Sequence, residues 1–229
     1  MNQISWQKSN DLVYRAYGLY EPVAVAKETK RLLEKIDLLL LAEPEALGKL
    51  PQEVRQLLKK YQALAFKEPV QGFFKPPCTI TLYEQAILAA AAKLALEPAV
   101  VKDGVICHEA FHYKHYQALA GFQQEPLSYW YGGKLFSKEA TVVKESLAEF
   151  CRYRWAVEQG HVSLAEAVVR RLKSIYGAWP SWPYGGAKGL IDLYAKDPEG
   201  AISKAEEIFR LSLISWPKAY GALGQVLLF

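Results

Sequence analysis

The helical spacing of apolar residues is the feature that most constrains this chain. Apolar side chains recur three and four positions apart along most of its 229 residues, a period typical of helices with one buried face. Proline and glycine divide the pattern into segments. Hydrophobic residues make up 51% of the chain and charged residues 23%. This share of hydrophobic residues is enough to form a buried core. We therefore expect a mainly α fold with a small amount of strand (α+β).

The first third of the chain, residues 1–75, is predicted to form a helical extension. Residues 21–42 and 51–66 both have helical periodicity and begin at or next to a proline, so they are expected to form an αα-hairpin. Pro76 and Pro77 then interrupt the chain. Residues 76–229 would form the second unit, although the two parts could also fold as one compact body.

The second unit is predicted to open with a strand over residues 78–83, because this stretch is β-branched and alternating. An alanine-rich helix should follow to Leu96, and a further helix should end near Gly121. Residues 129–136 resemble an aromatic hairpin around a Gly-Gly turn. Later helices are expected over residues 138–159, from a capping box at Ser163 to Gly177, and in two short segments beyond the loop at residues 179–186, the last opened by Asp197 and Pro198.

Charge and cysteine content exclude several classes of protein. The net charge is +4 without any single-sign run, which argues against a nucleic-acid or anionic-membrane partner. The three cysteines form no CxxC motif, and Cys107 and Cys151 are expected to be small core residues. No secretory signal opens the chain, and its longest aliphatic run, residues 36–42, is too short to span a bilayer. These features predict a cytoplasmic protein.

The stretch from His108 to His112 matches HExxH. Residues four apart on a helix project from one face, so both imidazoles can reach a single Zn²⁺. Glu109 is displaced around the helix and can act as general base on a water at the metal. Apolar neighbours such as Val105 and Phe111 suit a helix packed into a core. The alternative is a half-buried helix whose histidines bind no metal.

A zinc site needs a third protein ligand. His115 lies about 10.5 Å along the helix axis from His108 at 1.5 Å per residue, so one ion cannot easily reach both. We expect His115 to support one of the metal-ligating side chains, to face a substrate or to lie at the surface. Glu145 and Glu149 are the better candidates, because they lie four apart among apolar neighbours, where buried carboxylates need a cation or donors. Glu145 could bind the metal, while Glu149 accepts the free ring N–H of a ligand histidine.

HExxH on one helix, with Glu145 and Glu149 some tens of residues later on another, resembles the gluzincin group of zinc metallopeptidases, to which thermolysin belongs. The resemblance covers residues 105–150 and implies a zincin-like core with one zinc held by His108, His112 and Glu145. It also implies that Glu149 orients His108. Residues 79–83 would then be the edge strand that pairs with an extended substrate. No exopeptidase motif is present, and no particular family within the group is matched.

A peptidase also needs a donor that stabilises the oxyanion. The candidates are Tyr184, Tyr176, His161 and His115, of which Tyr184 is preferred because its glycine-flanked loop can approach a cleft; it could equally pack on Trp182. Arg152 could pair with Glu149 or lie at the surface.

The function expected from the sequence is zinc-dependent hydrolysis of peptide bonds, with a peptide or protein as substrate. The rival hypothesis is a non-catalytic or latent zinc protein, in which a fourth protein ligand such as Cys78 or His115 closes the site. Residues 129–131 could line a peptide subsite or form the core of their own hairpin.

Overall fold

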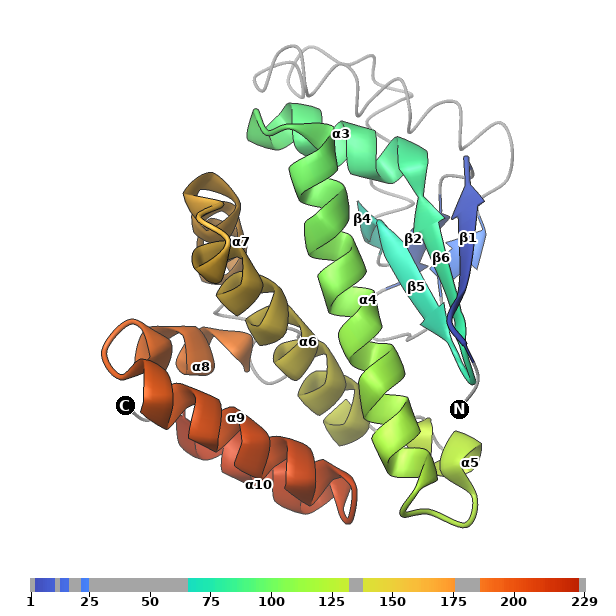
Figure 1. Ribbon diagram of the computed structural model, residues 1–229, viewed down its shortest axis with the longest axis vertical. Helices are drawn as coiled ribbons and strands as arrows, with labels where there is room; N and C mark the ends of the chain where they lie inside the picture. The colour runs from blue at the N-terminus through green and yellow to red at the C-terminus, as the bar shows by residue number, and fades with distance from the viewer. Residues whose placement is uncertain are drawn as a thin grey trace.

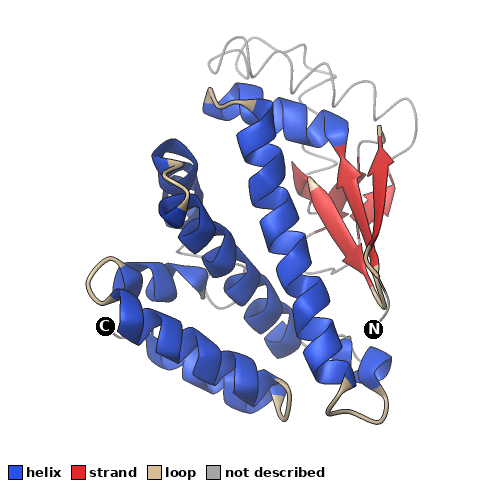
Figure 2. Cartoon of the chain, viewed as in Figure 1, coloured by secondary structure: helices blue, strands red, loops and turns tan. Residues whose placement is uncertain are grey.

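The computed structural model describes residues 3–10, 13–16, 22–24, 66–131, 138–175 and 186–226. Within these ranges the protein is mainly helical, as predicted, and its strands gather on one side of the helices (Figure 2). The helices are α3 (Glu84–Leu94), α4 (Pro98–Ala120), α5 (Pro126–Trp130), α6 (Lys138–Glu158), α7 (Val162–Ile175), α8 (Ala187–Tyr194), α9 (Pro198–Ser212) and α10 (Trp216–Val226). The strands are β1 (Ser5–Ser9), β2 (Val13–Ala16), β3 (Pro22–Ala24), β4 (Phe66–Pro69), β5 (Gly72–Lys75) and β6 (Thr79–Tyr83).

The strand predicted at residues 78–83 is confirmed as β6, but it is not an edge strand. It lies in the middle of a three-stranded sheet of order β1-β6-β5, parallel to β1 and antiparallel to β5. Its alternation directs Ile80 and Leu82 into the core. The expected edge position was wrong because both neighbouring strands come from the segment that was predicted to be helical.

The N-terminal region differs from its prediction in type. Pro22, expected to begin a helix, instead begins β3, which pairs with β2, and Phe66, expected to end one, begins β4. Proline is tolerated as the first residue of a strand, so its position alone could not distinguish the two. The remainder of the predicted hairpin, residues 25–65, lies outside the described residues. The boundary proposed after residue 75 falls between β5 and β6, which pair with each other.

The helices form layers beside the sheet (Figure 1). α4 packs on β5 on one side and on α6 on the other, and α8, α9 and α10 contact α6. One apolar core runs through these layers, from Phe74 and Ile80 in the sheet, past Leu119 and Leu147, to Ile208 in α9. The pair α4 and α6 therefore lies at the centre of the molecule. Among the described helices, none is both long enough and apolar enough to cross a bilayer.

Several helix boundaries agree with prediction and some do not. Asp197 caps α9 by accepting a hydrogen bond from the Gly200 N–H, with Pro198 as the first helical residue, as expected. The prediction of a hairpin over residues 129–136 was wrong for its described residues, because Tyr129 and Trp130 form the end of helix α5. α7 begins at Val162, one residue before the predicted cap, and α10 was not predicted. Gly177 and residues 132–136 lie outside the described part of the chain.

Candidate metal centre

Helix α4 supplies two imidazoles to one point. Pro98 occupies its first turn and it runs without interruption to Ala120, so His108 and His112 lie one turn apart on the same face. Both side chains are buried. Their Nε2 atoms lie 3.1 Å apart, and their rings meet edge to face with centroids separated by 4.8 Å. The helix thus directs both Nε2 atoms toward the same place.

Helix α6 supplies the third group. It packs along α4 and carries Glu145, which is 1% exposed. One carboxylate oxygen lies 3.4 Å from His108 Nε2, and the other lies 3.6 Å from His112 Nε2. Among the described residues, these three side chains form a group that could hold a metal ion, with ligand atoms all within 4.8 Å of one another.

The spacing of these atoms fits a tetrahedral ion. Two ligands that each lie about 2.0–2.1 Å from a tetrahedral zinc are separated from each other by about 3.3–3.4 Å. The Nε2–Nε2 separation of 3.1 Å and the separation of 3.4 Å between His108 Nε2 and Glu145 Oε2 lie close to that value, and the other oxygen of Glu145 lies 3.6 Å from His112 Nε2. Two imidazoles and one carboxylate are also a donor set that zinc and other first-row divalent metals accept.

Glu149 holds the far side of the His108 ring. Its Oε2 lies 3.2 Å from His108 Nδ1, so the ring can donate its Nδ1–H there and keep Nε2 free for a metal. Arg171 of α7 donates to Glu149 Oε1 at 3.1 Å, and Arg152 lies 3.9 Å from Oε2. Burial alone would raise the pKa of Glu149, but Arg171 and Arg152, together with His108, lower it to about 2. The carboxylate is therefore ionised.

The two candidate ligands His108 and His112 differ in their electrostatics. Burial would lower the pKa of His108, but hydrogen bonds to Glu145 and Glu149 outweigh it and raise the value to about 9. Burial dominates at His112 and lowers its pKa. In the metal-free protein His108 therefore takes a proton at neutral pH and forms a cation between two carboxylates. A metal cation would replace that positive charge at the same place.

Glu109 is held against the sheet. Its side chain is 5% exposed and packs beside Gly72, the first residue of β5. A Cβ at Gly72 would come within 2.8 Å of Glu109 Cγ and 2.7 Å of Val105 Cγ1. Only a glycine permits this approach without displacing a neighbour. Glu109 thus follows His108 on α4 but lies outside the three-residue group that could hold a metal ion.

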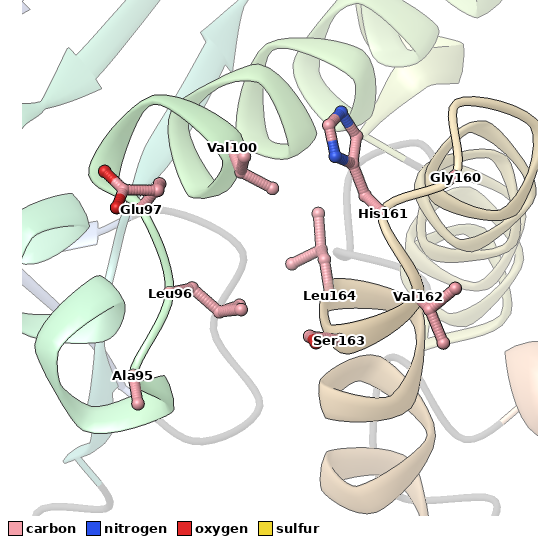
Figure 3. Close-up of a pocket in the computed structure, with 9 residues that line it drawn as sticks. All are labelled: Ala95, Leu96, Glu97, Val100, Gly160, His161, Val162, Ser163 and Leu164. Carbon is pink, nitrogen blue, oxygen red and sulfur yellow. The ribbon is translucent and has the colours of Figure 1, made fainter.

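Other residues proposed from the sequence lie elsewhere. His115 is fully buried, and its Nε2 is 2.7 Å from Ser212 Oγ, so it is neither a surface residue nor, among the described side chains, part of the ligand group. Cys78 does not join that group either. His161 packs on Trp155 and lines a separate cavity of about 500 Å³ between the α3–α4 and α6–α7 connections (Figure 3). Tyr184 and Tyr176 lie outside the described residues.

The aromatic cluster expected at residues 129–131 is largely core. Trp130 is fully buried, with its ring centroid 6.0 Å from that of His112, and Tyr129 stacks on Trp216. The buried Lys144 ammonium lies 4.2 Å from the Trp130 ring centroid. Burial lowers the pKa of Lys144 to about 7. The cluster therefore packs behind the metal centre, and Trp130 cannot line an open subsite.

Arg171 is the site residue that sequence reasoning missed. It lies on the helix after the one that carries Glu149, and nothing in its local pattern distinguishes it from Arg170. Arg152, in contrast, was considered, and its position beside Glu149 at 7% exposure excludes the surface alternative. The available signal was Glu149 itself, because a buried carboxylate requires a compensating cation.

Neither the known family models, nor the curated proteins, nor the solved structures gave a match to this chain.

Proposed function

We propose that this protein is a zinc-dependent peptidase in which His108, His112 and Glu145 hold the ion and Glu109 is the general base. The observation that carries the proposal is the convergence of three buried side chains whose ligand atoms all lie within 4.8 Å of one another, with the two imidazole Nε2 atoms 3.1 Å apart. Three protein ligands without a fourth among the described residues are typical of catalytic rather than structural zinc. When bound, zinc would supply a Lewis acid that polarises a carbonyl and acidifies water.

The protein's own side chains would do the remaining work. Glu149, held by Arg171, keeps the His108 ring in the tautomer whose Nε2 can bind metal. Glu109, one residue beyond His108 and outside the ligand group, would take a proton from the attacking water and return it to the leaving amine.

A peptide is the substrate class favoured by the position of β5. This strand ends the described part of its sheet and packs against α4 beside Glu109 (Figure 1). An extended peptide that added to β5 through main-chain hydrogen bonds would place its backbone near the general base. The role that the sequence suggested for residues 79–83 thus passes to β5.

The proposal is tested with zinc-loaded protein on a diverse library of quenched fluorescent peptides. Glu109→Gln should lower turnover by about 10²–10⁴-fold while leaving the zinc content unchanged. Glu166→Gln provides the matched control, since Glu166 is exposed at the surface of α7 and pairs with the equally exposed Arg170. Zinc content is measured by inductively coupled plasma mass spectrometry. Glu145→Ala is the variant that should lose the bound zinc.

The rival function is a latent or structural zinc protein, and the deep burial of the ligands favours it. His108, His112 and Glu145 are 7%, 3% and 1% exposed, respectively. Zinc-loaded protein that cleaves no peptide in the library would support this alternative and contradict the peptidase. Protein that binds no zinc, with Glu145→Ala equal to wild type in stability, would eliminate both.

A further inference from the structure

The cysteines Cys107 and Cys151 face each other across the two helices that carry the metal ligands. Cys107 precedes His108 on α4, and Cys151 follows Glu149 by two residues on α6. Their Sγ atoms lie 3.8 Å apart, and the Cys107 thiol also approaches the Cys151 carbonyl oxygen at 3.7 Å. The two residues are 44 positions apart in the chain, so this approach is made by tertiary packing.

The surroundings allow a bond between these sulfurs. Both side chains are partly exposed, so a small oxidant can reach them. The helices are already in close contact one turn away, where a Cβ at Gly104 would lie 3.1 Å from Arg152 Nε. A disulfide has an S–S length of about 2.05 Å, so the sulfurs need to approach by less than 2 Å, which side-chain rotation and a small helix shift can provide. Cys78, the third cysteine, lies before β6 and makes no such pair among the described residues.

We propose that Cys107 and Cys151 are a redox modification site that forms a reversible disulfide between α4 and α6 when the protein meets a peroxide. One sulfur attacks the peroxide O–O bond, is oxidised to a sulfenic acid and releases one water. The second sulfur attacks that sulfenic sulfur and displaces hydroxide, which leaves as a second water with the remaining thiol proton. Two thiols and one hydrogen peroxide thus give one disulfide and two waters, and a dithiol reverses the change.

The consequence is a covalent link between the helix that carries His108 and His112 and the helix that carries Glu145. This link would keep the ligand helices together when no metal bridges them. It does not depend on the proposed peptidase activity, because it requires only the two thiols and the packing of α4 on α6.

The test treats the full chain, freed of metal with EDTA, with a small excess of hydrogen peroxide. Peptide mapping of the non-reduced protein should find the Cys107 peptide joined to the Cys151 peptide, in a monomer lighter by two hydrogens. The unfolding midpoint should rise by about 5–15 °C and return after dithiothreitol. Cys78→Ser should behave as wild type, whereas Cys107→Ser and Cys151→Ser should show neither the link nor the rise.

Two results would overturn the proposal. One is independent oxidation of Cys107 and Cys151 to sulfinic acids without a link, and the other is a link made through Cys78 or between molecules. Mapping of the unmutated protein decides between these results and the expected one, so the test does not depend on whether a serine variant folds.

Discussion

At the scale of single residues, the buried carboxylate of Glu149 has a neighbour on each of three helices. His108 comes from α4, Arg152 from α6 and Arg171 from α7. The first of these contacts fixes the ring of His108, a candidate metal ligand, and the two arginines keep the carboxylate ionised. The orientation of the candidate ligand His108 is therefore linked through Glu149 to Arg171.

Removing the Arg171 side chain should weaken metal binding. In Arg171→Ala the carboxylate loses its closest cation and holds the His108 ring less firmly, so the zinc Kd should rise by about 10–100-fold. Arg170→Ala is the matched control, because the Arg170–Glu166 pair is 63% and 62% exposed and contributes little. The measurement is competition with a chromogenic chelator. Equal affinities for the two variants would show that Arg171 has no such role.

The stability that His108 contributes to the metal-free protein should decline as pH rises above neutrality. The pKa of His108 is raised from 6.5 to about 9 in the folded state, so the folded protein holds this proton more tightly than the unfolded chain. This contribution is complete below pH 6.5 and is lost as the pH rises to about 9. In urea unfolding with EDTA, the stability difference between wild type and His108→Gln should shrink between pH 6.5 and about 9, and His161→Gln, which keeps His108, should follow wild type. A difference between wild type and His108→Gln that stays constant over this range would contradict the assignment.

At the scale of elements, the contact between α4 and β5 explains why the general-base candidate is held beside the sheet. Gly72 lies where any side chain would meet Val105 and Glu109. Helix α4 was predicted from its periodicity and its end near Gly121, since both are local features. Strand β5 was not predicted, because four residues with two adjacent phenylalanines carry too short a pattern to identify a strand.

Gly72→Ala should therefore disturb both stability and the position of Glu109. Overpacking of this kind costs about 1–3 kcal/mol of unfolding free energy, and peptidase turnover should fall while zinc binding persists. Gly221→Ala is the control: Gly221 lies within α10, and a Cβ there meets no atom within 4 Å, so this variant should gain stability by about 0.5–1 kcal/mol. Unfolding curves for the two variants should shift in opposite directions, and a shared direction would argue against the close approach at Gly72.

At the scale of the whole molecule, one sheet joins strands from residues 5–9 and 72–75 to the helices that carry the candidate metal centre. β1 and β5 both pair with β6, from opposite sides. The unit predicted for residues 76–229 would contain β6 but neither of its partners, leaving two unpaired edges.

We therefore expect a fragment of residues 76–229 to unfold at a much lower temperature than the whole chain, or without a cooperative transition. A fragment of residues 70–229, which keeps β5 and lacks β1, should be intermediate. Circular dichroism during thermal unfolding makes the comparison. A fragment of residues 76–229 with the midpoint of the whole chain would show that the boundary after residue 75 is a true domain boundary.

Local patterns determined much of this protein. The period of the apolar residues predicted α3, α4, α6 and α9, and the four-residue spacings placed His108 with His112 and Glu145 with Glu149 on single helix faces, because helix geometry depends only on neighbours in the chain. Tertiary structure decided which elements that are remote in sequence contact one another. The central position of β6, the arginine that holds Glu149 and the approach of Cys107 to Cys151 all join segments that are remote in sequence. Such contacts arise from the packing of whole helices and strands, which no local periodicity encodes.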